Sequence, residues 1–460
     1  MHSITLRSVV LVLCETLLIL AAVAIGAYVR LGDWAWYLLR YENGFEKTLI
    51  VAGVTQACLY YADLYDFRHI SDRRELFQRL AQALAVASFV LAALYYWFPA
   101  LVIGRGAFAI SAAIAIPAII GWRFAFEWLS ARMGPRERLL LVGTSAAAVS
   151  LAQELYSRRH ELGVELVGFI DPDPAKVGSP VINPGIIGTV EDIPSIVRAR
   201  QVDRVVVSLS DARGKLPMDK LLEMKIDGVT FDHLASVYEE YTGKIAVENL
   251  RPSWFIFSSG FRKGRWLDAS KRGLDLLFAC VGLALVWPVM LILTAVVRTV
   301  SKGPALYHQQ RVGLNGHVFT VHKFRTMRVD AEAATGPVWA SKHGDPRIIP
   351  FGGVMRRARL DELPQLWNVI KGDMSMVGPR PERPEFVAEL TQKIPYYGQR
   401  HTVRPGITGW AQVRYTYGAS VEDALQKLQY DLYYIKNLSV PLDLFIVFTT
   451  IKTVLLRRGA

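Results

Sequence analysis

Four long apolar stretches near the N-terminus restrict the fold of this chain more than any other feature of its sequence. They cover roughly residues 8–29, 47–66, 80–102 and 107–128, and each is close to the ~20 residues that an α-helix needs to cross a bilayer. Hydrophobic residues make up 52% of the 460 residues, which agrees with several membrane segments. The first stretch is too long for a signal peptide and lacks a small-residue cleavage site. We therefore expect a bundle of four transmembrane helices over residues 1–130.

The basic residues between these stretches predict how the bundle lies in the membrane. Arginines follow the second and the fourth stretch, at Arg68, Arg73, Arg74, Arg79, Arg132, Arg136 and Arg138. The loops at 30–46 and 103–106 are less basic. Cytoplasmic loops are the ones enriched in Lys and Arg, so we expect the N-terminus and residues 129 onward on the cytoplasmic side.

Isolated polar and sulfur-containing residues in the apolar stretches carry less information. Glu15 lies in the first stretch and suits either a transport path or a contact between helices, and a single acidic residue favours the contact. Cys14, Cys58 and Cys280 have neither the spacing of a metal site nor that of a disulfide framework.

Residues 131–255 have the alternating pattern of a parallel α/β domain. Strands are expected over 138–143, 165–170, 203–209 and 228–233, with a helix over 146–156. The first turn, Gly143 to Ala148, keeps only the first glycine of the G-x-G-x-x-G dinucleotide fingerprint. Asp171 follows the second strand and suits either a ribose-binding acid or an ordinary Asp-Pro-Asp turn. The incomplete fingerprint favours a structural or regulatory Rossmann-like domain over a nucleotide-binding one.

A further apolar run extends from residue 276 to 297 between basic flanks at 271–272 and 298–302. Its length would suit a fifth spanning helix, which would place the rest of the chain outside. However, two basic ends favour the same cytoplasmic side of the membrane, and Pro288 in the middle favours a bend. We therefore expect a re-entrant helix over about 271–300, which enters the membrane, bends and returns.

The run from Arg356 to Pro381 combines residues that suggest chemistry. Four apolar residues recur with a helical period: Leu363, Leu366, Trp367 and Ile370. This period predicts a short amphipathic helix with Asp361 as its N-cap and Gly372 at its end. Asp361 and Glu362 would then lie at a helix N-terminus, where anions are favoured, and three arginines precede them within five residues. The set suggests chemistry on a phosphate, whereas the alternative is that both acids only stabilise the helix.

The surrounding domain is strongly basic. Residues 298–360 contain eleven Lys or Arg and only three Asp or Glu, which suits lipid head groups and diphosphates. The net charge of +12, in so apolar a chain, indicates lipid and phosphorylated substrates and not nucleic acid. Candidate substrate contacts that are equally suited to structural ion pairs are Arg311, Lys323, Arg325 and Arg404. We interpret His322 and His401 as structural.

Four motifs in order carry a resemblance to a known family: Lys323–Met327, Leu360–Gln365, Val377–Pro381 and Arg404–Gly409. Over about residues 264–460 the chain closely resembles the bacterial polyprenyl-phosphate phosphoglycosyl transferases of the monotopic superfamily. These are the initiating sugar transferases of exopolysaccharide and O-antigen synthesis, and the N-terminal region resembles the long form of the family. One departure is Trp287, which stands before Pro288 where small family members often have Ser.

The resemblance implies a reaction and a role for several residues. The enzyme would transfer a hexose 1-phosphate from a UDP-sugar to undecaprenyl phosphate and release UMP, at the cytoplasmic face of the bacterial inner membrane. Asp361 matches the family's nucleophile, which forms a covalent phosphosugar intermediate, and Glu362 matches its partner and would bind Mg²⁺. Arg356 matches a phosphate-binding residue. Pro379, Arg380 and Pro381 match the nucleotide-recognition motif, with Arg380 as the contact.

We therefore expect an integral membrane enzyme of mixed membrane-α and α/β class. It would have a four-helix bundle (1–130), a Rossmann-like domain (131–255) and an α-rich catalytic domain (264–460) with interfacial helices, one of them the apolar tail at 442–456. Glucose, galactose and N-acetylated sugars all remain open as substrates, and the long form is compatible with a homodimer.

Two alternatives belong to other functional classes. A non-catalytic scaffold for polysaccharide assembly would be favoured by an altered acidic pair, but Asp361 and Glu362 are intact. A membrane-anchored nucleotide-sugar oxidoreductase would need a complete glycine fingerprint and a Tyr-x-x-x-Lys pair, and Tyr241 to Lys244 has the wrong spacing.

Overall fold

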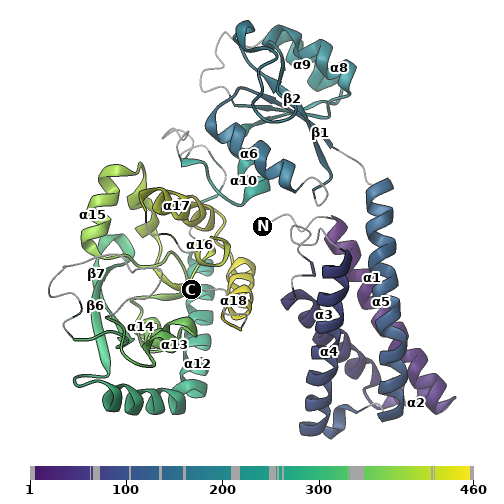
Figure 1. Cartoon of the computed structure of the whole chain (residues 1–460), viewed down its shortest axis with the longest axis vertical. Coiled ribbons are helices and arrows are strands. Elements are labelled where there is room, and N and C mark those ends of the chain that lie inside the picture. The colour runs from purple at the N-terminus through teal and green to yellow at the C-terminus, as the bar shows by residue number, and fades with distance from the viewer. Residues whose placement is uncertain are drawn as a thin grey trace. The chain divides into compact units, whose positions relative to one another are not determined.

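The computed structural model describes most of the chain and divides it into two compact units, His2–Val237 and Tyr238–Ala460 (Figure 1). The described residues are 6–62, 64–65, 73–102, 105–133, 137–158, 162–208, 218–247, 255, 258, 260–261, 264–329, 331, 347–415, 418 and 420–455. Two of the arginines used to predict the membrane orientation, Arg68 and Arg136, lie outside these residues. The orientation therefore stays a prediction.

The first unit begins with a helical bundle. Its helices are α1 (Leu6–Leu31), α2 (Trp34–Tyr41), α3 (Gly44–Tyr61), α4 (Arg73–Trp97), the 3₁₀ helix η1 (Pro99–Leu101) and α5 (Arg105–Met133). By length and apolarity α1, α4 and α5 could each cross a membrane, whereas α3, over the second predicted stretch, is not among the candidates in the described chain. The connection at 30–46, expected as a loop, contains α2, with exposed Trp34 and Trp36 on its surface.

Glu15 joins two of the bundle helices. Its carboxylate accepts a hydrogen bond from Arg123 of α5 at 2.5 Å, and both side chains are almost fully buried. The Tyr65 hydroxyl donates to the second oxygen of Glu15 at 2.5 Å, and Arg123 also donates to the carbonyl of Leu64. A buried charge is tolerated where it is paired and hydrogen-bonded. The interpretation of Glu15 as a helix contact is therefore confirmed.

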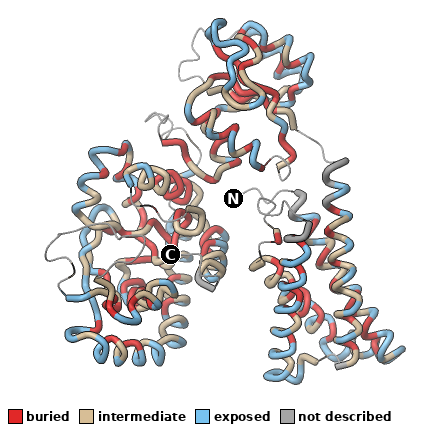
Figure 2. Tube along the Cα trace, viewed as in Figure 1, coloured by how far each residue is buried: buried red, intermediate tan, exposed pale blue. Residues whose placement is uncertain are grey.

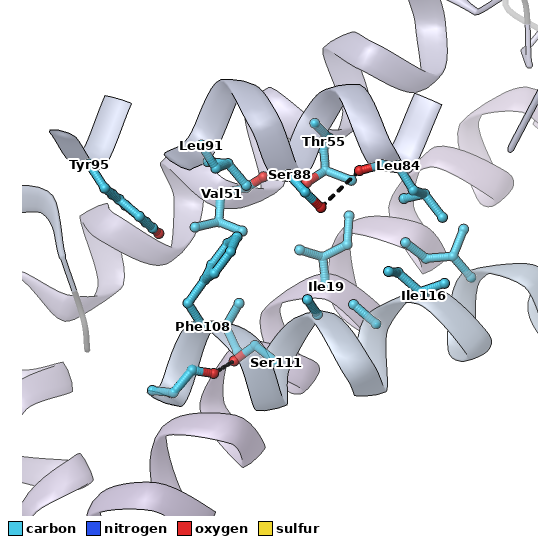
Figure 3. A pocket seen from close by; sticks show the side chains of 16 residues that line it. Ile19, Val51, Thr55, Leu84, Ser88, Leu91, Tyr95, Phe108, Ser111 and Ile116 are labelled. Carbon is cyan, nitrogen blue, oxygen red and sulfur yellow. Dashed lines mark hydrogen bonds between the residues drawn. The ribbon is translucent and has the colours of Figure 1, made fainter. Parts of the chain in front are cut away.

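The bundle also encloses a cavity of about 50 Å³ between α1, α3, α4 and α5 (Figure 3). Its walls are mostly apolar, and its labelled side chains include Ile19, Leu91 and Phe108. The Ser88 and Ser111 hydroxyls in the wall donate to carbonyls one turn earlier in their own helices, at 2.9 and 2.7 Å. None of the predicted site residues lines this cavity.

The α/β part of the first unit contains a five-stranded parallel sheet in the order β3-β2-β1-β4-β5. Its strands are β1 (Glu137–Val142), β2 (Val164–Ile170), β3 (Ile186–Gly188), β4 (Arg204–Val207) and β5 (Thr230–His233). The helices are α6 (Ala146–Ser157), α8 (Ile193–Arg200) and α9 (Met218–Ile226), with 3₁₀ turns η2 (Pro174–Lys176) and η3 (Val190–Asp192). Helix α10 (Leu234–Thr242) begins in the first unit and ends in the second. The parallel α/β prediction is confirmed, although the short β3 was not predicted.

The first turn of this sheet is closed by local hydrogen bonds. Gly143 has φ of 104°, a conformation that glycine adopts without strain. Asp171 accepts hydrogen bonds from the Thr144 hydroxyl at 2.7 Å and from the backbone N–H of Asp173 at 3.0 Å. The contact with Asp173 is that of the ordinary turn, one of the two interpretations of Asp171, and the contact with Thr144 joins the ends of β1 and β2.

The second unit is rich in helices. Its helices are α12 (Arg265–Val300), α13 (Gly352–Arg357), α14 (Gln365–Lys371), α15 (Pro384–Lys393), α16 (Trp410–Arg414), α17 (Val421–Lys436) and α18 (Val440–Leu455), with 3₁₀ turns η5 (Leu314–Gly316), η6 (Leu360–Glu362) and η7 (Tyr397–Thr402). β6 (Leu306–Val312) and β7 (Val318–Phe324) form an antiparallel hairpin, and β8 (Ser375–Val377) pairs in parallel with β9 (Gly406–Thr408). The largest apolar core surrounds the buried rings of Trp410, Tyr397 and Tyr434.

Helix α12 covers the predicted re-entrant segment. Figure 1 shows α12 changing direction along its length, and Pro288 lies inside it. Only 11% of its most apolar window is buried in the structure, and Leu285 and Ile292 are more than half exposed. Figure 2 colours each residue of the chain by its burial. Because so little of the protein packs against α12, its apolar side chains need another apolar environment, such as lipid.

The helix predicted to start at Asp361 starts later. The backbone N–H groups before α14 bond to carbonyls three residues back and not four, which is the 3₁₀ pattern. Leu363 N–H is bonded to the Leu360 carbonyl at 3.4 Å and Leu366 N–H to the Leu363 carbonyl at 3.2 Å, so the chain forms η6 and α14 begins only at Gln365. The N-cap prediction for Asp361 is wrong, whereas Gly372 ends α14 as predicted, with φ of 97°.

Candidate active site

The β6–β7 hairpin and α14 are held together by one buried side chain, Asn368. Its amide nitrogen donates to the Thr320 carbonyl at 2.7 Å, and its amide oxygen accepts from the His322 N–H at 3.2 Å. This double contact holds β7 beside the start of α14. It therefore brings Lys323, on β7, to Glu362, in η6 just before α14, with 3.4 Å between the ammonium and the carboxylate.

Glu362 is buried and surrounded by cations. Arg380 donates to its Oε1 at 2.9 Å, Lys323 lies 3.4 Å from the same oxygen, and Arg359 lies 3.3 Å from Oε2. Burial alone would raise the pKa of Glu362, but Arg380, Lys323 and Arg359 outweigh it and hold the pKa far below its usual value. Glu362 is therefore ionised at neutral pH, and its carboxylate contacts three cationic side chains.

Asp361 is the next residue in the chain, and its surroundings differ. It is half-buried, and no hydrogen bond or ion pair joins its carboxylate to another residue in the described part of the chain. Burial raises its pKa, and the negative charge of Glu362 raises it further, although Lys323, Arg356 and Arg380 act in the opposite direction. Two adjacent carboxylates thus have opposite pKa shifts, which is typical of residues with different chemical tasks.

Arg359 takes part in this arrangement through its backbone as well. It has φ of 52°, in the left-handed region that non-glycine residues rarely adopt. This conformation turns the chain from α13 into η6, while the side chain reaches Glu362. The sequence indicated it only as one of three arginines upstream of the acids, so its contact was missed.

Two glycines allow the backbones of the β8 and β9 segments to approach closely just before Arg380, which reaches Glu362. Gly378 directly follows β8, and Gly406 is the first residue of β9. The two glycines lie so close that a Cβ on Gly406 would be 2.1 Å from the Gly378 nitrogen. The Gly378 N–H donates to the Thr408 carbonyl, and the Gly406 N–H donates to the Pro379 carbonyl, both at 2.9 Å. The motifs Val377–Pro381 and Arg404–Gly409 are therefore bonded to each other and form one structural element.

The rest of the Pro379-Arg380-Pro381 segment is fixed by arginines. Arg311 of β6 donates to the Pro381 carbonyl at 3.0 Å. Arg400 donates to the Arg380 carbonyl at 3.0 Å, and it is buried against Asp431 of α17, at 2.9 Å. Neither Arg400 nor Asp431 was predicted as part of the site. Both lie near recognised motifs, but only their side-chain contacts show that they support Arg380.

The remaining predicted basic residues have different positions. Arg325 donates to the carbonyls of Ser301 and Lys302 at the end of α12, both at 2.8 Å. Arg404 donates to the Gly372 carbonyl at the end of α14, at 3.1 Å. Such contacts stabilise the negative ends of helices. Arg356 is half-buried and close enough to lower the pKa of Asp361, so it belongs with Lys323 and Arg380 at the acidic pair.

The two histidines near the motifs have contacts away from the acidic pair. Burial and the nearby Arg400 lower the pKa of His401 to about 4, so its ring is neutral at pH 7. His322 lies opposite His308 in the hairpin, with 2.8 Å between their Nδ1 atoms. These contacts agree with the structural interpretation of both residues.

The acidic pair suits a hard cation only as part of a shared site. In the described part of the chain, no group of three or more His, Cys, Asp or Glu side chains gathers to hold a metal ion. Mg²⁺ is commonly held by one or two carboxylates, with phosphate oxygens and water completing its shell. Of the acidic pair, Glu362 is the side chain that its surroundings keep ionised, so its carboxylate fits an ion shared with a diphosphate.

Comparison with known proteins finds related sequences for both halves of the chain. A family model described as bacterial sugar transferase matches residues 266–457, and a model described as CoA-binding domain matches residues 61–221. A UDP-N-acetylgalactosamine-undecaprenyl-phosphate N-acetylgalactosaminephosphotransferase of Aeromonas hydrophila is 41% identical over 233 residues, which cover 50% of this chain and 53% of that protein.

Two longer matches cover more of the chain. Both relatives are UDP-glucose:undecaprenyl-phosphate glucose-1-phosphate transferases. The protein of Xanthomonas campestris pv. campestris is 34% identical over 70% of this chain and 68% of its own length. The protein of Escherichia coli (strain K12) is 32% identical over 72% of this chain and 70% of its own length. The matches thus span from about half to about two thirds of these relatives.

Proposed function

Because the chain belongs to the bacterial sugar transferase family, we propose that it transfers a hexose 1-phosphate from a UDP-sugar to undecaprenyl phosphate and releases UMP. The observation that carries this proposal is the contrast within the acidic pair. Glu362 is engaged by three cations, whereas the neighbouring Asp361 carboxylate is free of hydrogen bonds to described residues. A nucleophile needs such freedom, because an oxygen that is already bonded to a cation attacks poorly.

The proposed reaction has two displacements at one phosphorus atom. In the first, an Asp361 oxygen attacks the phosphorus that carries the sugar, and the bond from that phosphorus to the bridging oxygen breaks. UMP leaves with the bridging oxygen, and the phosphosugar is held as an acyl phosphate on Asp361. In the second, an oxygen of undecaprenyl phosphate attacks the same phosphorus and releases the carboxylate. The product is a sugar linked to undecaprenyl diphosphate.

The cations around the pair suit this chemistry. Lys323, Arg356 and Arg380 each influence the charge of Asp361, and we propose that they bind the diphosphate of the UDP-sugar. Negative charge that develops on the leaving phosphate is stabilised by fixed positive groups in a site shielded from water. Arg380 would contact the nucleotide side, where it is held between Pro379 and Pro381.

We further propose that Glu362 and the diphosphate hold Mg²⁺, which when bound would neutralise phosphate charge. Glu362 already binds three cations, so the ion would share its carboxylate with them or replace one of them. Arg380, Lys323 and Arg359 lower the pKa of Glu362 strongly and so keep its carboxylate ionised.

The membrane arrangement forms part of the proposal. We propose that α12 enters the inner membrane from the cytoplasmic side, bends near Pro288 and returns, while α18 lies along the membrane surface. The exposed apolar side chains of α12, and exposed Leu444 and Phe448 on α18, support this. The active site would then face the cytoplasm beside the phosphate of undecaprenyl phosphate. The step would be the first membrane step of exopolysaccharide or O-antigen synthesis.

UMP release tests the function directly. The purified protein is incubated with undecaprenyl phosphate, Mg²⁺ and a panel of UDP-sugars that includes glucose, galactose and N-acetylated sugars. We expect release with at least one sugar, loss of release in Asp361→Asn, and unchanged release in Glu389→Gln, which alters an exposed acid on α15. No release with any sugar by well-folded protein would favour the scaffold alternative.

The intermediate has its own test. Without undecaprenyl phosphate, the wild type should release about one UMP per enzyme and retain the labelled phosphosugar on Asp361, as ping-pong kinetics require. UMP release that continues in Asp361→Asn would refute the nucleophile while leaving the transferase possible.

A further inference from the structure

The first turns of α12 carry a charged group that the proposed reaction does not use. Lys271, Arg272 and Asp275 precede the apolar part of the helix. Asp275 is four positions after Lys271 and three after Arg272, and residues at these spacings are neighbours on a helix surface. All three side chains point into the catalytic unit, where they contact two separate segments of the active site.

One set of contacts fixes β8. Asp275 Oδ1 accepts hydrogen bonds from the Ser375 hydroxyl at 2.9 Å and from the Met376 N–H at 2.8 Å. Lys271 donates to the Val377 carbonyl at 2.9 Å, and its ammonium lies 2.6 Å from Asp443 of α18. Every residue of β8 is thus bonded to α12, and the chain continues from β8 through Gly378 to Arg380.

A second set of contacts fixes the end of α14. Arg272 donates to the Val369 carbonyl at 2.7 Å and to the Ile370 carbonyl at 2.8 Å. Carbonyls in the last turn of a helix have no partner within the helix. α14 begins three residues after Glu362, so its position sets where the acidic pair lies. The two ends of the site, Arg380 and the acidic pair, are therefore anchored on the same two turns of α12.

The burial of these groups argues against a role in stability alone. Asp275 is 4% exposed, and its acceptor oxygen is used twice. An apolar side chain at such a position would pack at no desolvation cost, whereas buried polar contacts allow only one arrangement of the parts that they join. The contacts suit a device that holds two loops in a fixed geometry.

We propose that Lys271, Arg272 and Asp275 are positioning residues that tie the membrane helix to the active site, with Asp275 and Lys271 holding Arg380 and Arg272 holding the acidic pair. This inference rests on the proposed function for its kinetic consequences. The position of α12 in the membrane then determines the distance between Arg380, the nucleotide contact, and Asp361, the nucleophile.

The test uses the full-length protein in nanodiscs and separates the acceptor role of Asp275 from its charge. Asp275→Ala removes the acceptor, Asp275→Asn keeps an oxygen at the same place, and Asp268→Ala makes the same change at an exposed position of the same helix. We expect Asp275→Ala to raise the KM for the UDP-sugar about tenfold, the effect of losing one or two hydrogen bonds. The KM for undecaprenyl phosphate should change less than about twofold, Asp275→Asn should restore most of the loss, and Asp268→Ala should match the wild type.

A double variant shows whether the effect passes through Arg380. If Asp275 acts by holding Arg380, the variant Asp275→Ala/Arg380→Ala should be no worse than Arg380→Ala alone, because coupled residues are not additive. Additive losses would overturn the proposal, as would an Asp275→Asn variant as impaired as Asp275→Ala.

Hydrogen–deuterium exchange gives a readout that needs no catalysis. Asp275→Ala should speed exchange in residues 375–381 and leave the bundle helices unchanged. Unchanged exchange in 375–381 would overturn the positioning role even if the enzyme is active. Conversely, the proposed function would be refuted and the positioning role kept if the wild type releases no UMP while Asp275→Ala still speeds exchange in residues 375–381.

Discussion

The buried pair of Arg400 and Asp431 should be one of the most sensitive points of the catalytic unit. The guanidinium and the carboxylate are 2.9 Å apart, and their side chains are only 5% and 2% exposed. Burial raises the pKa of Asp431 to about 6 despite Arg400, so the carboxylate is still ionised at pH 7. Asp431→Asn keeps the shape of the side chain and removes its charge, which leaves a buried cation without a counter-charge.

The size of the effect follows from burial. Removing one partner of a buried ion pair costs about 3–5 kcal/mol. A unit of the size of Tyr238–Ala460 shifts in Tm by about 2–4 °C per kcal/mol. We therefore expect Asp431→Asn to lower the Tm by about 6–20 °C, measured by tryptophan fluorescence of the protein in nanodiscs. UMP release should fall as well, because Arg400 also supports the Arg380 carbonyl.

An exposed ion pair on α15 provides the matched control. Lys393 and Glu389 are closer, at 2.7 Å, but their side chains are 53% and 51% exposed. Exposed pairs contribute about 0–1 kcal/mol, so Glu389→Gln should shift the Tm by less than about 4 °C. If Asp431→Asn shifts the Tm no more than Glu389→Gln does, the argument from burial is refuted.

Three further predictions concern the active site. Asp361 must be ionised to attack, and its pKa is raised. As the pH is lowered, kcat should therefore begin to fall at a higher pH than it would with an ordinary aspartate, and a profile that is flat down to pH 4 would contradict this. Gly406→Ala places a Cβ 2.1 Å from the Gly378 nitrogen and should destabilise the fold by about 3 kcal/mol or more, whereas Gly398→Ala, with open space around it, should unfold like the wild type. Chelation with EDTA should abolish UMP release and added MgCl₂ should restore it; full activity in EDTA would exclude the proposed Mg²⁺.

The sequence was informative where local patterns decide the structure. The apolar lengths predicted α1, α4 and α5, and alternating strands and helices predicted the parallel sheet. The glycines of the motifs also have a local signature, although only the structure shows that Gly378 and Gly406 touch. The short β3 was missed because three residues leave no pattern.

Local patterns were misleading about where an element begins. The apolar period over 363–370 suggested a helix from Asp361, but the residues before Gln365 form 3₁₀ hydrogen bonds and α14 begins only there. The same period counted Trp367 with the buried residues, yet it is 56% exposed. A periodic pattern gives the type of element more reliably than its first residue.

The sequence by itself determined the family, since its motifs are runs of contiguous residues, and from the same kind of local pattern it predicted the order of domains and the acidic pair. Only the tertiary structure decided what each cation does. Lys323 and Arg380 meet Glu362, whereas Arg325 and Arg404 bind helix ends. The physical reason is that a long basic side chain has the same chemistry wherever it lies, and its partner comes from a distant part of the chain. Burial and the neighbouring Glu362 raise the pKa of Asp361, whereas Arg380 and Lys323, which come from distant parts of the chain, lower the pKa of Glu362.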